Sequence, residues 1–374
     1  MKMMKAVNLK DKGGLVNTGI TVLYDHDIEY SHKLGIAHFW EHMAFKGTTT
    51  RSEKEIIHAV ESRGGHFNAY TSQTEIVFYI TGPAEHQLVF EEILLDIVWN
   101  SNFPTEEINK ERRPILEELR MSEDDPWGYI VENFEIMTSL ESHPILGTEE
   151  SINSIDGESL LKFKNDVLSQ PGCVFPWSSK VWKTKYSRDK STPLGGRTIN
   201  VGQINATAPK RKDLLKDGIS SSYVIVGSLH GGLMDPKIEN YIMTANELGG
   251  GFSSPLFQRI REELGMAYQV ASQNFNFAKF GAIIALAICD KQNVETVINE
   301  MIEIICKEHP VTDRSRNMSK SGMMSSMQKV ERRMGDKNNE FLSKPLDLNK
   351  LYSIERTVAL NNDDLFVITL TPKD

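Results

Sequence analysis

Two histidines and a glutamate that could act together lie in the pentapeptide His-Phe-Trp-Glu-His, residues 38–42. Residues four apart in a helix lie one above the other, so His38 and His42 can offer two imidazole nitrogens to one ion. Glu41 lies beside them and can move a proton. A zinc ion lowers the pKa of a bound water to about 7, and a carboxylate can take that proton as the water attacks a carbonyl. The pattern therefore predicts hydrolysis.

A histidine pair with this spacing also occurs by chance on ordinary helices, so the pentapeptide alone leaves both interpretations open. The H-x-x-E-H form is a zinc-protease pattern that requires a helix and a third ligand. Apolar residues inside the motif and the glycine- and threonine-rich stretch 47–50 after it predict a short buried helix.

The next segment predicts a helix and a hairpin. Ser52 and Glu55 form a capping box ahead of an apolar helical pattern, which ends at Gly64-Gly65. Residues 66–71 and 75–80 are rich in aromatic and β-branched residues, which is typical of two paired strands.

A third ligand is expected to be a carboxylate, because the three cysteines show no paired spacing. The candidates lie in the predicted helix 105–123, where Glu111 and Glu118 are seven apart and share one face after two turns. The pattern alone does not choose between Glu111, Glu117 and Glu118.

Residues 35–47 resemble the active-site segment of the pitrilysin, insulysin and mitochondrial-processing-peptidase family of zinc endopeptidases, and the likeness continues through residues 64–71 and 111–118. The resemblance implies one zinc ion per chain. It makes Glu117 a surface residue and assigns the site as follows: His38, His42 and Glu118 as ligands, Glu41 as general base, and Glu111 as the carboxylate that orients the ligands from behind.

Residues 248–268 resemble the family's second-domain pattern. That resemblance implies that Arg261 and Tyr268 reach across to the substrate and the developing oxyanion. Without it, Arg261 is interpreted as a surface charge near Glu262, and Tyr268 as a strand residue in the core.

The resemblance also implies an α+β fold: two similar domains, each a mostly antiparallel β-sheet flanked by helices, which close like a clamshell in the LuxS/processing-peptidase-like metallohydrolase fold. We expect an N-terminal catalytic domain over 1–195 and a metal-free C-terminal domain over 206–374, separated by a polar linker within 185–215. The segment 162–185 lacks a clear strand pattern, so the first sheet is expected to be short or irregular. A length of 374 residues agrees with two or three domains.

Composition and charge limit which binding partners and which cellular compartment we expect for this protein. A net charge of −9 argues against nucleic acid and mildly favours basic peptides. No apolar run is long enough to span a membrane, and no apolar segment follows the first lysines as a signal peptide would, so we expect a cytoplasmic protein. Cysteines without paired spacing fit a reducing compartment.

The sequence as a whole predicts a zinc endopeptidase that cleaves unfolded peptides or targeting sequences. Substrate is expected as an added β-strand along Phe67, Asn68 and Ala69. The alternatives are a catalytically inactive peptide-binding or scaffold subunit and a purely structural zinc site. Sheet edges left unpaired in a shortened chain would favour a homodimer or heterodimer.

Overall fold

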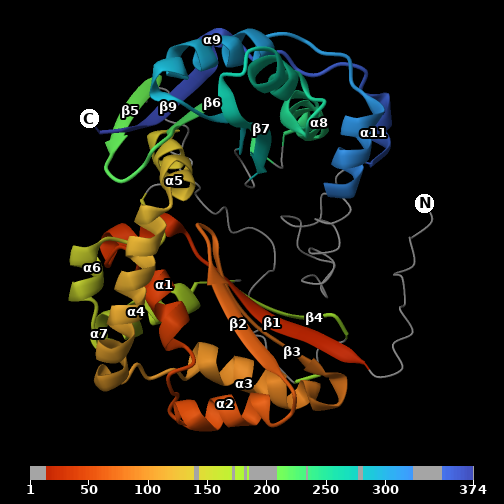
Figure 1. Cartoon of the computed structure of the whole chain (residues 1–374). Coiled ribbons are helices and arrows are strands. Elements are labelled where there is room, and N and C mark those ends of the chain that lie inside the picture. The colour runs from red at the N-terminus through yellow and green to blue at the C-terminus, as the bar shows by residue number, and fades with distance from the viewer. Residues whose placement is uncertain are drawn as a thin grey trace.

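The computed structural model of the chain describes residues 14–138, 143–170, 173–180, 183–184, 209–232, 235–276, 281–322 and 348–373. The chain forms two lobes, each with one β-sheet and its own helices (Figure 1). The predicted α+β fold with two similar domains is confirmed. The predicted linker lies largely outside the described residues, and the proposed division at 195 and 206 stays a prediction.

The sheet of the first lobe has four antiparallel strands in the order β2-β3-β1-β4. Their bounds are β1 Leu15–Leu23, β2 His66–Thr71, β3 Glu75–Pro83 and β4 Val174–Ser178. The predicted hairpin of β2 and β3 is confirmed, and β2 lies at the edge of the sheet. The segment 162–185, which lacks a clear strand pattern, holds the short strand β4. Pro176 hides the strand pattern there, but proline is tolerated because β4 is an edge strand.

Helices cover this sheet in two layers. α1 (Ile36–Met43) and α3 (Gln87–Trp99) pack on the strands, and α4 (Thr105–Asp124) and α7 (Gly157–Leu168) cover α1. The remaining helices are the 3-10 helices η1 (His26–Ser31) and η2 (Ala84–His86), α2 (Glu53–Glu61) and α6 (Glu149–Ser154). The capping box at Ser52 is present as predicted. α1 is short but rigidly placed, because Ile36, Phe39 and Trp40 are fully buried.

α4 is a long helix with one narrow apolar face. Ile108, Ile115 and Leu119 are buried on that face, while charged residues cover the rest. In the part of the chain that the structure describes, no helix combines the length and apolar character needed to cross a membrane.

The second lobe has a five-stranded sheet in the order β5-β9-β6-β8-β7, antiparallel except for the parallel pair β5 and β9. Its strands are β5 Arg211–Lys216, β6 Ser222–His230, β7 Ala267–Asn276, β8 Gly281–Cys289 and β9 Leu365–Pro372. α8 (Ile238–Gly249) and α9 (Val294–Ile305) cover one face. The shorter elements are the π-helical η4 (Phe257–Glu263), η5 (Lys291–Asn293), α11 (Leu348–Ser353) and η6 (Asn362–Asp364).

α5 (Pro126–Thr138) connects the two lobes. It follows α4 directly in the chain, yet Ile130 and Phe134 pack on Ile225 and Ile284, on the sheet face opposite α8 and α9. Lys212 Nζ donates a hydrogen bond to Asn133 Oδ1 at 2.9 Å on the same side. Figure 1 shows α5 between the lobes. Both faces of the second sheet are thus buried, one of them by a helix from the first half of the chain.

Candidate active site

The helix that carries the pentapeptide is fixed at its N-terminus by backbone contacts. Gly35 has a φ of 81°, which favours glycine, and a Cβ there would lie 2.5 Å from the Leu146 carbonyl oxygen. The buried Glu29 carboxylate accepts hydrogen bonds from Gly35 N at 2.7 Å and from Ala37 N at 2.9 Å. A carboxylate is stabilising at a helix N-terminus. The sequence analysis did not single out Glu29.

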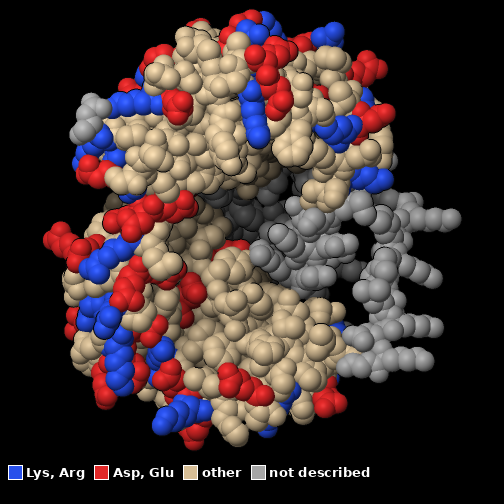
Figure 2. Space-filling model, in the orientation of Figure 1, with Lys and Arg blue, Asp and Glu red and all other residues tan. Residues whose placement is uncertain are grey.

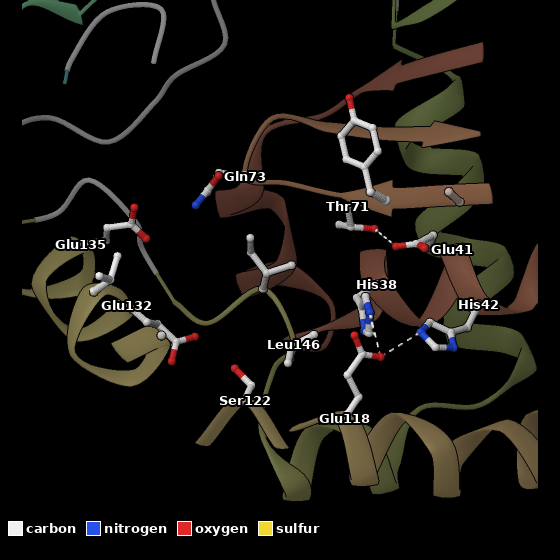
Figure 3. A pocket seen from close by; sticks show the side chains of 15 residues that line it. His38, Glu41, His42, Thr71, Gln73, Glu118, Ser122, Glu132, Glu135 and Leu146 are labelled. Atoms are coloured by element: carbon white, nitrogen blue, oxygen red, sulfur yellow. Dashed lines mark hydrogen bonds and ion pairs between the residues drawn. The ribbon is translucent and has the colours of Figure 1, made fainter. Parts of the chain in front are cut away.

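The structure brings His38, His42 and Glu118 together. Glu118 Oε2, from α4, lies 3.6 Å from His38 Nε2 and 3.3 Å from His42 Nε2, both from α1 (Figure 3). One ligand atom of each residue lies within 4.8 Å of the others. Two imidazoles and one carboxylate form the donor set of a catalytic zinc site that keeps one position open. The residues therefore fit a zinc ion.

Glu118 and Glu117 differ in the face of α4 on which they lie. Glu117 lies on the exposed side of α4, where its Oε1 accepts a hydrogen bond from Arg113 Nε at 2.9 Å. The Glu118 carboxylate is the one that approaches both His38 and His42, and its role as third ligand stays a prediction.

Glu111 supports His42 from behind. Its Oε1 lies 3.1 Å from His42 Nδ1, which leaves His42 Nε2 directed toward Glu118. Its Oε2 lies 2.9 Å from Lys46 Nζ. The hydrogen bond to His42 lowers the pKa of Glu111, and Lys46 adds to the effect against burial. The sequence analysis gave no role to Lys46, which lies in the turn after α1, four residues beyond His42.

Glu41 is held by the sheet rather than by the metal ligands. Thr71 Oγ1, at the end of β2, donates a hydrogen bond to Glu41 Oε2 at 2.7 Å. Burial raises the pKa of Glu41, although the bond from Thr71 and the charge of His42 oppose the shift. Such a carboxylate takes up a proton more readily than an exposed one. The sequence pattern places Thr71 in the predicted strand 66–71 and assigns it no further role.

The two histidines have opposite pKa shifts. Burial, with the charge of His42, lowers the pKa of His38 to about 4. Burial also acts against a charged His42, but hydrogen bonds to Glu111 and Glu118 outweigh it and raise the pKa of His42 to about 9. A metal ligand must be a neutral imidazole, so cation binding would release a proton from His42.

A pocket of about 420 Å³ opens in front of these residues. Ala69, Tyr70 and Thr71 of β2 form one wall. Glu132 and Glu135 of α5 line it on the side opposite the two histidines (Figure 3). Burial and the charge of Glu123 raise the pKa of Glu132. Figure 2 shows that the surface between the two lobes is recessed on the face in view.

The three predicted substrate residues lie on the edge strand but differ in exposure. Ala69 lines the pocket, and Asn68 is exposed. Asn68 Oδ1 accepts a hydrogen bond from Ala69 N at 2.8 Å. The Phe67 ring stacks on Phe45 with 4.8 Å between centroids, so it packs on the core.

Arg261 and Tyr268 lie together in the second lobe. The Arg261 guanidinium is 5.9 Å from the centre of the Tyr268 ring and 4.8 Å from that of Phe257. Tyr268 is 80% exposed, so its interpretation as a core residue is wrong. Arg261 Nε lies 3.8 Å from Glu262, as the surface-charge interpretation expects. Neither side chain lines the pocket.

Together, a two-lobed α+β fold and an inverted histidine-glutamate-histidine set define the class of inverted zinc peptidases. The insulinase family (peptidase family M16) matches residues 10–145, and the peptidase M16 inactive domain matches residues 195–314. The chain belongs to the insulinase family, peptidase family M16.

Relatives cover most of the chain. An uncharacterized zinc protease of Rickettsia felis is 32% identical over 324 residues, 81% of this chain and 76% of the relative. One of Bacillus subtilis is 28% identical over 342 residues, 87% and 83% of the two chains. The crystal structure of a protease from Helicobacter pylori has the same fold, with a TM-score of 0.73, 17% identity and coverage of 97% and 95%.

Proposed function

We propose that this protein is a zinc-dependent endopeptidase that hydrolyses peptide bonds in unfolded peptides or targeting sequences. The observation that carries the proposal is the position of Glu41, which lies beside the His38, His42 and Glu118 set and faces the pocket. A purely structural metal site has no use for a buried carboxylate next to an open coordination position.

In this proposal each residue of the site has a separate role in catalysis. Zinc, when bound, supplies a Lewis acid that polarises the scissile carbonyl and makes water a nucleophile near neutral pH. Glu41 accepts the proton of the attacking water and passes it to the leaving amine. Thr71 keeps the Glu41 carboxylate pointed at the pocket. Glu111 and Lys46 hold the His42 ring in place.

Substrate would add to the edge strand β2 in an extended conformation. The backbone of Ala69 would then exchange its hydrogen bond with Asn68 for one with the peptide. Backbone pairing of this kind accepts many sequences but excludes folded proteins. Glu132 and Glu135 place two carboxylates on the opposite wall, which favours a basic side chain in the substrate.

The second lobe would complete the site. We propose that the Tyr268 hydroxyl donates to the developing oxyanion and that Arg261 binds the substrate, which requires the lobes to close further, because neither residue lines the pocket. Pairing with a second chain, the same or different, stays an untested prediction.

The experiment that tests the function is Glu41→Gln in a peptide-cleavage assay that is sensitive to a chelator. The variant should bind as much zinc as the wild type, because Glu41 is not a ligand, and should lose several orders of magnitude in kcat. Retained cleavage would exclude Glu41 as the base. A wild-type protein that binds zinc and peptides but cleaves none would support the alternative of an inactive peptide-binding subunit.

A matched pair of variants tests the metal ligands. Glu118→Ala should strongly reduce the zinc content, while Glu117→Ala removes the same charge from the exposed face of the same helix and should leave it unchanged. Equal zinc content in the two variants would contradict the ligand set.

A further inference from the structure

A second cluster of potential metal ligands lies in the first lobe. It consists of His26 and Glu29 of η1 and of His143, which follows α5 in the chain. One nitrogen or oxygen of each lies within 4.8 Å of the others, as is also true of His38, His42 and Glu118. All three side chains are buried, whereas Glu118 is half exposed.

Hydrophobic packing alone does not explain why a histidine is buried at position 26. The side chain is 6% exposed, and neither ring nitrogen has a hydrogen-bond partner among the described residues. Burying a polar group without a partner destabilises the folded state. The ring lies against that of His143, with 3.7 Å between the centroids and 42° between the planes. A phenylalanine would fill this space without that cost, so the nitrogens need another explanation.

Glu29 can supply the charge that a cation requires: burial raises the pKa of Glu29 to about 8 against the backbone hydrogen bonds, and a bound cation would favour the ionised carboxylate. Each of its oxygens accepts one backbone hydrogen bond, from Gly35 and from Ala37, and each keeps a second lone pair. Glu29 Oε2 lies 3.8 Å from His143 Nδ1. A buried carboxylate is costly unless a charge or several donors compensate it. A divalent cation between the two rings and the carboxylate would compensate it directly.

His143 is positioned by the backbone. Its Nε2 donates to the His26 carbonyl oxygen at 3.2 Å, and its Nδ1 is 3.2 Å from the Pro144 carbonyl oxygen. These contacts hold the two rings together although 117 positions separate them in the chain. Metal-bound histidines are commonly oriented by a carbonyl in this way.

We infer that His26, Glu29 and His143 form a second site for a divalent transition metal such as zinc, beyond the one per chain that the sequence predicts. Two imidazoles and a carboxylate are suitable ligands for zinc. Burial, together with the charge of His143, lowers the pKa of His26 to about 3, which keeps its lone pair available at neutral pH. The three side chains are buried, so we infer a structural role.

The site would act on the N-terminus of the helix that carries the first site. Glu29 binds the backbone of Gly35 and Ala37, and Ala37 directly precedes His38. A metal that fixes Glu29 would therefore also fix the start of α1. Loss of this metal should loosen that helix without removing any ligand of the first site.

Metal stoichiometry of the full-length protein, compared with that of the His26→Phe variant, tests the inference. The apoprotein is titrated with Zn²⁺, and bound metal is measured by elemental analysis after dialysis. A parallel titration with Co²⁺ is followed by visible absorption, which reports nitrogen and oxygen ligation. Two equivalents of metal per chain are expected. Saturation at one equivalent, with the His26→Phe variant also binding one, would overturn the second site.

Variants assign each equivalent to its site. His26→Phe keeps an aromatic ring in the core and should bind one equivalent, as should His38→Ala, and the double variant should bind none. His58→Gln removes a histidine from the exposed face of α2 and should still bind two. If the first site alone is wrong, wild type binds one equivalent and His26→Phe none, so the two hypotheses fail differently.

Thermal unfolding provides a readout independent of activity. In the His38→Ala background, saturating Zn²⁺ should raise the melting temperature by several degrees, because ligand binding to the native state stabilises it. The same addition to the double variant should leave the melting temperature unchanged. A rise of equal size in the double variant would contradict the assignment to His26. Circular dichroism checks that each variant is folded.

Discussion

Thr71 Oγ1 donates a hydrogen bond to Glu41 Oε2 at 2.7 Å, which joins the edge strand of the first sheet to the helix of the metal ligands. In Thr71→Val the shape is kept but the donor is lost, so the Glu41 carboxylate is no longer oriented. A hydrogen bond to a charged group contributes about 1.5–3 kcal/mol, which predicts a fall in kcat of roughly 10- to 100-fold. Thr71→Ser should restore most of the rate, and zinc content should be the same in all three proteins.

Glu111 and Lys46 are predicted to set metal affinity without touching the metal. Glu111→Gln keeps an acceptor for His42 but removes the charge that Lys46 neutralises, so zinc affinity should fall by about 10- to 100-fold. Competition with a chromophoric chelator measures the change. Lys46→Met should act in the same direction, and Lys110→Met, on the exposed side of α4, provides the control. An unchanged zinc affinity in Glu111→Gln would mean that Glu111 contributes to the stability of the fold and not to metal binding.

Glu132 is predicted to select basic side chains. In Glu132→Gln, kcat/KM for a peptide with a lysine or arginine near the cleaved bond should fall by about tenfold, while a matched neutral peptide changes little. Glu117→Gln removes the same charge from an exposed residue of α4 that does not line the pocket and should leave the ratio of the two peptides unaltered. If both variants shift the ratio equally, the preference comes from net charge and not from the pocket wall.

Variants of Tyr268 and Arg261 test whether the second lobe takes part in the reaction. Tyr268→Phe keeps the ring that stacks near Arg261 but removes the hydroxyl, so kcat should fall by about 10²-fold with KM unchanged. Arg261→Ala should mainly raise KM. Neither should alter zinc content, and the exposed Arg113 supplies a control as Arg113→Ala. Wild-type kinetics in Tyr268→Phe would show that the Tyr268 hydroxyl takes no part in the reaction.

Asp96 links stability to pH. Burial acts to raise the pKa of Asp96, but hydrogen bonds from Asn100, Arg51 and Thr48 outweigh it and hold the pKa below its usual value. A depressed pKa in the folded state gives stability that is present above the unfolded value of about 4 and is lost as the pH falls through the folded value. Asp96→Asn should therefore lower the free energy of unfolding, measured with urea at pH 7, by roughly 2 kcal/mol. The difference from wild type should shrink below about pH 4. A constant difference would mean that the carboxylate charge contributes nothing.

Much of the metal site could be predicted from the sequence because its geometry is local. The pitch of a helix fixes residues four apart on one face, so His38 and His42 form a pair wherever the pentapeptide is helical. The capping box at Ser52 and the hairpin of β2 and β3 are also local patterns, and both are confirmed. The spacing on α4 reduced the third ligand to three glutamates but could not choose one.

The tertiary structure decided the rest, because it depends on which apolar faces bury one another. The structure places α5 on the second sheet with Glu132 on the wall of the pocket. Hydrophobic burial is non-directional, so no spacing encodes that choice. For the same reason the contacts of Thr71 with Glu41 and of His26 with His143 join segments far apart in the chain. The sequence by itself predicted two ligands and a base, and only the packing of elements determined which residues surround them.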